Sequence, residues 1–202
     1  MKTTELIFIL DRSGSMAGLE KDTIGGYNSL LKKQQGKVNV TTVLFDDRYE
    51  ILHDHLPIGK VKPITEQEYY VRGCTALLDA VGRTINHMSA YDDKNHQFIM
   101  VITTDGYENA SREFTLKQIS SMIEVKRARG WEFIFLGANI DAIETARGLG
   151  INDKRAANNI NDHEGLEVAY ESLSRTVKTF ACSGVVNDDW SKEIDGYYES
   201  HK

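Results

Sequence analysis

Short, unbroken apolar runs alternate along the chain with segments whose apolar residues recur at helical spacing. Residues 6–10 and 98–102 are unbroken apolar runs, and residues 38–45 and 131–136 are mostly apolar. Strands of a parallel sheet show such unbroken runs because helices cover both faces of the sheet. The pattern therefore predicts an α/β fold with a doubly wound, mostly parallel central sheet and helices on both of its faces.

Two further strands are expected at the sides of this sheet. Only Asp46, Asp47 and Arg48 separate the run at 38–45 from a strand expected at 49–53. So short a link cannot hold a crossover helix, and it predicts an antiparallel pair at the sheet edge. Residues 155–160 are expected to form a short last strand, although their asparagines disfavour strand structure.

The helices are predicted from apolar periodicity together with start and stop signals. They are expected over residues 17–35, 75–88, 115–130, 141–150 and 163–182. Thr115 and Gln118 form a capping-box signature, and Gly36, Gly130 and Gly150 stand where helices commonly end. Residues 56–71 contain both prolines and show no clear period, so we expect irregular structure there.

Length and composition favour one globular domain. The chain has 202 residues, of which 41% are hydrophobic, and a net charge of −6. We expect the domain to span residues 1–185, with residues 186–202 as a C-terminal extension or tail that either packs or frays. The acidic balance and the lack of a basic block argue against nucleic-acid binding.

No part of the sequence predicts export or a membrane span. The first apolar run is only five residues long before Asp11 interrupts it, and a signal peptide needs a longer one. No segment approaches the roughly 18 apolar residues of a transmembrane helix. Cys74 and Cys182 lie far apart and form no metal-binding pair. A reduced, cytoplasmic location is the simplest interpretation.

Carboxylates and hydroxyls stand at the ends of predicted strands. Asp11, Ser13 and Ser15 follow the first apolar run, Asp105 follows the run at 98–102, and Thr75 opens a predicted helix. Ligands of doubly wound sheets gather beyond the carboxyl ends of the strands, so these side chains are expected to converge. Hard oxygen ligands suit Mg²⁺ or Mn²⁺. Taken singly, the serines could merely cap a helix.

The order and spacing of these five residues resemble the metal-ion-dependent adhesion site (MIDAS) of von Willebrand factor type A (vWA) domains. Asp11, Ser13 and Ser15 form its D-x-S-x-S motif, and the resemblance extends over residues 5–182. It implies a Rossmann-like vWA fold in a small stand-alone intracellular member. It also implies that Ser13 and Ser15 bind the cation directly, Thr75 directly or through water, and Asp11 and Asp105 mostly through water.

The resemblance implies a non-enzymatic module that binds partner proteins in a cation-dependent way. An Asp or Glu of the partner would complete the coordination of Mg²⁺ or Mn²⁺. Stand-alone intracellular members of the family frequently work beside AAA-type ATPases or in stress-response assemblies. Arg72, Tyr107 and Glu108 are candidates for a partner-binding rim, and a polar surface loop is the alternative for them.

A magnesium-dependent hydrolase or phosphotransferase that uses the same oxygen cluster is the alternative function. It would need a nucleophile or general base beside the metal. Neither Ser13 nor Ser15 lies in the G-x-S-x-G motif of a nucleophile elbow, and the chain has no P-loop or dinucleotide-binding fingerprint. The sequence offers no better base than Asp11 or Asp105, and both are already assigned to the metal.

Overall fold

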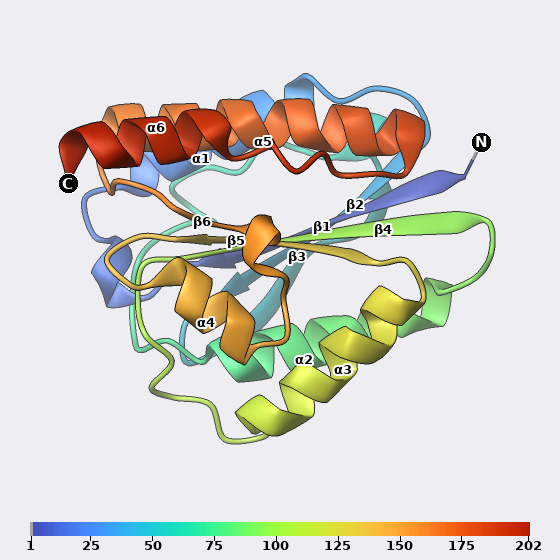
Figure 1. Cartoon of the computed structure of the whole chain (residues 1–202), viewed down its shortest axis with the longest axis horizontal. Helices are drawn as coiled ribbons and strands as arrows, with labels where there is room; N and C mark the ends of the chain where they lie inside the picture. The colour runs from blue at the N-terminus through green and yellow to red at the C-terminus, as the bar shows by residue number, and fades with distance from the viewer. Residues whose placement is uncertain (1) are drawn as a thin grey trace.

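A six-stranded sheet forms the centre of the structure, a computed structural model that describes residues 2–202 (Figure 1). The strands are β1 (Thr3–Asp11), β2 (Val38–Phe45), β3 (Tyr49–Pro57), β4 (His96–Thr104), β5 (Glu132–Gly137) and β6 (Ala156–Asn158). Their order across the sheet is β3-β2-β1-β4-β5-β6, and only the edge strand β3 runs antiparallel to its neighbour. The predicted sheet is confirmed.

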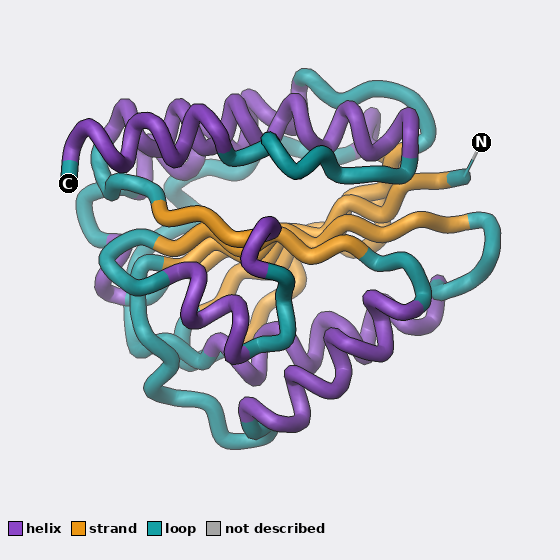
Figure 2. Tube along the Cα trace, in the orientation of Figure 1, coloured by secondary structure: helices purple, strands orange, loops and turns teal. Residues whose placement is uncertain are grey.

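Helices cover both faces of the sheet, as the tube in Figure 2 shows. One layer contains α1 (Glu20–Lys32), α5 (His163–Ser183) and α6 (Lys192–His201). The other contains α2 (Leu77–Met88), α3 (Leu116–Ala128) and α4 (Ala142–Gly148). Short 3-10 turns lie at Gly14–Met16, Ile58–Lys60, Ser89–Tyr91 and Asp153–Arg155.

The two helical layers explain the unbroken apolar run of β1. Leu6, Phe8 and Leu10 face the layer that contains α1 and α5, whereas Ile7 and Ile9 face the layer that contains α2 and α3. All five side chains are fully buried. A strand that alternates between two apolar surfaces has no solvent-facing position, so no polar alternation appears in its sequence.

The starts of α3 and α4 lie at the capping residues that the sequence predicts. The capping box of Thr115 and Gln118 is present, and Asp141 accepts a hydrogen bond from the backbone N–H of Glu144. The first helix starts at Glu20 instead of the predicted residue 17, since Gly18 adopts a φ of 94° and separates the helix from the 3-10 turn before it. Such a positive φ interrupts helical geometry.

The C-terminal residues pack into the helical layer that contains α1 and α5. Val186, Trp190 and Ile194 are buried in the same apolar cluster as Leu173 and Val177 of α5. The indole N–H of Trp190 donates to the carbonyl of Lys154 at 2.9 Å. The sequence predicts either packing or fraying for residues 186–202, and in the structure residues 192–201 form a helix while Val186, Trp190 and Ile194 are buried.

The two edge strands are short or irregular. β6 has three residues, and β3 extends to Pro57, beyond the predicted end at residue 53. Its pairing with β2 shifts register twice, and His55 takes a positive φ of 49°. Within residues 2–202, no helix has the length and apolar character required to cross a membrane.

Candidate metal centre

The sheet topology places Asp11 and Asp105 side by side at the carboxyl ends of two central strands. β1 and β4 are parallel neighbours at the centre of the sheet, and Asp11 ends β1 while Asp105 follows β4. From β1 the chain crosses to β2 on one side, and from β4 it crosses to β5 on the other side. A crevice opens where the winding direction reverses, and ligands of such sheets bind there.

Three hydroxyl groups converge in this crevice. The Ser13 and Ser15 Oγ atoms lie 3.0 Å apart, and the Thr75 hydroxyl donates to Ser13 Oγ at 3.0 Å. Thr75 comes from the loop before α2, and its backbone N–H donates to Asn109 Oδ1 at 2.9 Å. The Ser15 hydroxyl donates to Asp105 Oδ1. The structure thus brings together all five residues that the sequence predicted as a metal site.

Both carboxylates of the cluster are buried and accept hydrogen bonds. Asp11 accepts from the Ser13 backbone N–H at 2.7 Å and from the Thr104 hydroxyl at 2.5 Å. Burial raises the pKa of Asp11 to about 6, although these hydrogen bonds oppose the shift. Burial also raises the pKa of Asp105. A cation bound nearby would stabilise the ionised form of these two poorly solvated carboxylates.

The arrangement of oxygens fits a small divalent cation. Adjacent oxygens around an octahedral Mg²⁺, with bonds of about 2.1 Å, lie about 3.0 Å apart. The Ser13–Ser15 and Ser13–Thr75 separations between hydroxyl oxygens are both 3.0 Å. Gly106 leaves the space open, because a Cβ there would lie 2.9 Å from Thr75 Oγ1 and 3.0 Å from Ser15 Oγ. Within residues 2–202, no three His, Cys, Asp or Glu side chains form a metal-binding group.

Exposure differs among the residues of the cluster. Asp11, Ser13, Thr75 and Asp105 are all buried, whereas Ser15 is exposed. The buried members fix the oxygens in place, since their hydrogen bonds leave them few alternative rotamers. The exposed member leaves one side of the cluster open to solvent, and an incoming group can reach it from there.

The three predicted rim residues lie in different environments. Tyr107 is 62% exposed and free to contact a partner. Glu108 instead points inward and accepts a hydrogen bond at 2.9 Å from the backbone N–H of Leu78, so it caps the start of α2. Arg72 is half-buried and donates to Asp46 at 2.6 Å. Of the three, Tyr107 alone is strongly exposed.

Sequence reasoning missed several residues that support the cluster. Thr104 holds Asp11, Asn109 holds the backbone of Thr75, and Asn161 donates to Asp105 Oδ2 at 3.1 Å. Asn161 follows β6, so its place beyond a strand end was a signal that could have found it. The neighbouring asparagines disfavour strand structure and therefore weaken this signal.

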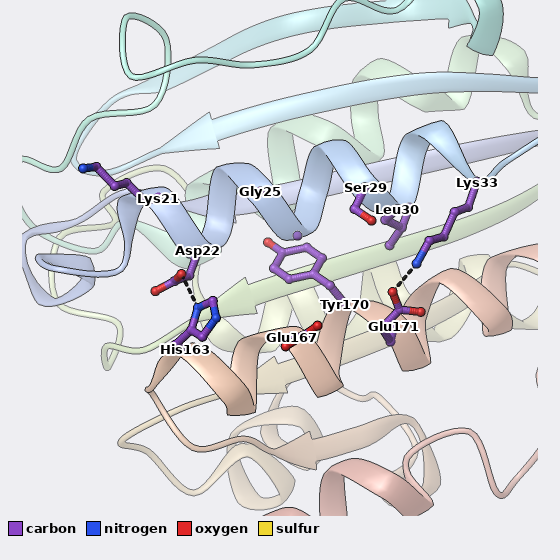
Figure 3. A pocket seen from close by; sticks show the side chains of 11 residues that line it. Lys21, Asp22, Gly25, Ser29, Leu30, Lys33, His163, Glu167, Tyr170 and Glu171 are labelled. Atoms are coloured by element: carbon purple, nitrogen blue, oxygen red, sulfur yellow. Dashed lines mark hydrogen bonds and ion pairs between the residues drawn. The ribbon is translucent and has the colours of Figure 1, made fainter.

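A separate hollow of about 270 Å³ lies between α1 and α5 (Figure 3). The ion pair of His163 with Asp22, at 2.6 Å, and the ion pair of Lys33 with Glu171 bridge its two sides. The Tyr170 ring packs against Gly26, where a Cβ would overlap the ring at 2.3 Å. Four of its charged side chains are used in these two ion pairs, and among residues 2–202 no cluster of hydroxyls and carboxylates like that of the metal centre lines the hollow.

Comparison with solved structures identifies the fold. The von Willebrand factor domain of the type V pili tip protein Mfa5 from Porphyromonas gingivalis superposes with a TM-score of 0.68 at 11% identity. That match covers 93% of this chain and 99% of the other.

Two larger proteins also contain the same fold. The ArnB paralog VWA2 from Sulfolobus acidocaldarius matches with a TM-score of 0.58 at 14% identity over 88% of this chain and 45% of its own. A von Willebrand factor type A protein from Catenulispora acidiphila gives a TM-score of 0.58 at 12% identity over 88% and 43%. This chain therefore spans less than half the length of these two. No protein-family model and no curated protein matches the sequence. The structure has the vWA fold.

Proposed function

We propose that this protein is a divalent-cation-dependent module that binds an acidic residue of a partner protein. The observation that carries the proposal is the convergence of three hydroxyls and two buried carboxylates at the carboxyl edge of a vWA-type sheet. The proteins of similar fold include a pili tip domain, which is consistent with an interaction role. A cytoplasmic location, and an AAA-type ATPase or stress-response assembly as partner, stay predictions from the sequence.

Each residue of the centre has a distinct part in this proposal. Ser13, Ser15 and Thr75 would hold Mg²⁺ or Mn²⁺ through their hydroxyl oxygens. Asp105 fixes the Ser15 hydroxyl, and Asp11 fixes the backbone of Ser13, through hydrogen bonds that the structure contains. A bound cation would supply positive charge for a carboxylate that arrives on the exposed side of Ser15. Neutral hydroxyls leave most of that charge available to the partner.

The same contacts argue against the hydrolase alternative. Both oxygens of Asp11 accept hydrogen bonds from Ser13 and Thr104. Both oxygens of Asp105 accept them from Ser15 and Asn161. A general base needs a carboxylate oxygen that is free to take a proton from substrate or water. Every oxygen of these two carboxylates already accepts one hydrogen bond, which makes either carboxylate a poor candidate for that role.

Mn²⁺ titration by calorimetry tests the cation site. We expect the wild-type protein to bind one Mn²⁺ and the Ser13→Ala/Ser15→Ala variant to lose this binding, because two of three direct ligands are gone. A Ser29→Ala/Ser121→Ala variant, which removes two helix hydroxyls that form no hydrogen bond within residues 2–202, serves as the matched control. Equal binding by the wild type and the Ser13/Ser15 variant would overturn the assignment.

The function itself is tested by capture of partners from lysate with Mn²⁺ or with chelator. Partners that bind the wild type only with Mn²⁺, and that the Ser13→Ala/Ser15→Ala variant does not bind, support the proposal. Identical partners under all conditions contradict it. Turnover of phosphate esters with Mg²⁺ that Asp105→Ala abolishes would favour the enzyme alternative instead.

A further inference from the structure

We propose that Arg12, Asp46 and Arg72 form a clamp that sets the spacing of the hydroxyls in the metal centre. This inference rests on the proposed function. The Nε atoms of both arginines donate to the same carboxylate oxygen, Asp46 Oδ2, at 3.1 Å from Arg12 and 2.6 Å from Arg72. One oxygen atom therefore ties two segments that are 60 residues apart in sequence.

The two segments are those that carry the metal-site hydroxyls. Arg12 lies between Asp11 and Ser13, in the first loop of the centre, and Arg72 lies three residues before Thr75, in the second. Asp46 is the first residue after β2, and it belongs to neither loop. It thus acts as a fixed point on the sheet against which both loops are positioned.

Burial makes the clamp rigid. The side chains of Arg12 and Asp46 are fully buried. Arg12 Nη2 donates to Glu50 at 2.7 Å, and Arg12 Nη1 donates to the carbonyl of Glu68 at 3.2 Å, so the whole guanidinium is held. Burial disfavours the charged form of Asp46, yet hydrogen bonds from Arg72 and the Arg48 backbone keep its pKa below the ordinary value. A buried guanidinium without its carboxylate would be costly, so this geometry is strongly enforced.

Backbone contacts extend the clamp to the hydroxyl-bearing residues. The Arg72 N–H donates to the carbonyl of Arg12 at 2.9 Å, and the Gly14 N–H donates to the carbonyl of Gly73 at 3.2 Å. Gly73 has a φ of 66°, and a Cβ on it would lie 2.3 Å from Asp47 Oδ1. Only glycine permits the second loop to pass this close to the turn that holds Asp46.

The clamp adds no net charge beside the cation site. The two guanidinium charges are balanced by the carboxylates of Asp46 and Glu50. The guanidinium carbons of both arginines lie near the Tyr70 ring, at 5.3 Å from its centroid for Arg12 and 5.2 Å for Arg72. Arginine is suited to such combined ion pairing and stacking. The clamp can therefore position the loops without repelling a cation.

The consequence concerns the 3.0 Å separation of the Ser13 and Thr75 oxygens. These two hydroxyls come from different loops, and a neutral hydroxyl is a weak ligand whose contribution depends on its position. Loosening the tie at Asp46 would let the loops move apart and weaken cation binding. Arg12, Asp46 and Arg72 are positioning residues, since none of them supplies a metal ligand.

Mn²⁺ affinity of two variants tests the clamp. Asp46→Asn removes the shared charge, and Arg72→Gln releases the second loop while leaving the buried pair of Arg12 and Asp46 intact. We expect each variant to bind Mn²⁺ about 10- to 100-fold more weakly than the wild type, as is typical when groups that orient metal ligands are lost. Arg72→Gln keeps the test valid if Asp46→Asn fails to fold.

Asp92→Asn provides the matched control. Asp92 also accepts from two basic side chains, Lys126 at 2.7 Å and Arg129 at 3.1 Å, but it precedes β4, whereas Asp105 follows that strand. Nine strand residues at about 3.3 Å each separate the two ends by about 30 Å. This variant should lose thermal stability but keep wild-type Mn²⁺ affinity, and its Tm should still rise on addition of Mn²⁺.

The outcomes separate this inference from the proposed function. If the wild type binds Mn²⁺ and both clamp variants bind it equally well, the clamp is wrong while the metal centre stands. If the clamp variants and Asp92→Asn all weaken binding to the same extent, the effect reflects general stability and the clamp is again overturned. If the wild type binds no Mn²⁺, the proposed function itself fails.

Discussion

Gly106 shows how one missing side chain keeps the candidate metal centre open. A Cβ added to Gly106 would lie 2.9 Å from Thr75 Oγ1, 3.0 Å from Ser15 Oγ and 3.9 Å from Ser13 Oγ. Its φ is outside the positive range, so alanine could adopt the same backbone. The need for glycine here comes from the space that the oxygens require and is independent of the turn itself.

Gly106→Ala should therefore impair cation binding with little effect on folding. We expect Mn²⁺ affinity to fall by about tenfold or more, because the hydroxyls must move to accommodate the methyl group. Calorimetric titration measures the affinity, and thermal unfolding measures the stability. Gly25→Ala on α1 is the control, since nothing lies within 4 Å of its added Cβ. An unchanged affinity in Gly106→Ala would show that the hydroxyls do not need this space.

At this scale, the sequence revealed the residues whose chemistry is recognisable without a structure. Asp11, Ser13, Ser15, Thr75 and Asp105 carry oxygens and follow or precede predicted elements, so strand topology alone predicts that they meet. Asp46 and Asn161 also follow strands, so their general position was predictable, but the partners of their hydrogen bonds were not. They depend on which loops touch, and charged or amide residues in polar loops give no periodic signal.

At the scale of elements, the carboxylate of Asp92 links the start of β4 to the end of α3. Asp92 precedes β4, and it accepts from Lys126 at the end of α3 and from the Trp131 indole at 3.2 Å. The Lys126 ammonium also lies 4.8 Å from the centre of the Trp131 ring. The end of α3, the start of β4 and the residue before β5 therefore depend on the same ion pair.

The stability supplied by Asp92 should depend on pH. Burial opposes ionisation of Asp92, but hydrogen bonds from Lys126 and Trp131 outweigh it and lower its pKa in the folded state. The contribution is then fully present above the unfolded pKa of about 3.9 and is lost as pH falls through the lower folded value. Urea unfolding between pH 7 and pH 3 should show an acid loss that is smaller in Asp92→Asn.

At pH 7, Asp92→Asn should reduce the free energy of unfolding by about 1.5–3 kcal/mol, the range for hydrogen bonds to charged groups. Glu199→Gln offers a surface comparison, because its carboxylate pairs with Lys202 and is 63% exposed. Exposed pairs contribute little, about 0–1 kcal/mol. Parallel acid profiles for the wild type and Asp92→Asn would contradict the role assigned to this carboxylate.

Element types were predictable where one signal dominates. Apolar runs buried between two layers identified the parallel strands, and the three-residue link at 46–48 identified the antiparallel edge. Boundaries were less predictable, because a tertiary contact can replace a local cap. The start of α2 is an example, since Glu108 from another loop caps Leu78 and no local residue does so.

At the scale of the whole molecule, α6 completes the layer formed by α1 and α5. Trp190 is 6% exposed and Ile194 is 2% exposed, and both join the core beneath α5. Sequence patterning gave little weight to this segment because its three aromatic residues are set among acidic ones. Burial of two large side chains makes the extension part of the cooperative unit.

Trp190→Ala should lower the free energy of unfolding by about 3–5 kcal/mol, as large-to-small changes at buried aromatic sites do. Chemical denaturation followed by circular dichroism measures the change. Tyr107→Ala is the control, because this side chain is 62% exposed and its loss should shift stability by less than about 0.5 kcal/mol. A loss below about 1.5 kcal/mol in Trp190→Ala would indicate that residues 186–202 are only loosely attached to the core.

The irregular edge strands β3 and β6 limit the ways in which another chain can pair with this sheet. β6 offers only three residues for pairing, and β3 carries two register shifts, a positive φ at His55 and a terminal proline. Bulged, short or proline-bearing edges resist the addition of a further strand. Neither a second copy nor an extended peptide can readily lengthen the sheet, which protects the protein against edge-to-edge aggregation. Under the proposed function, recognition of a partner would then fall to the loops at the carboxyl ends of the strands.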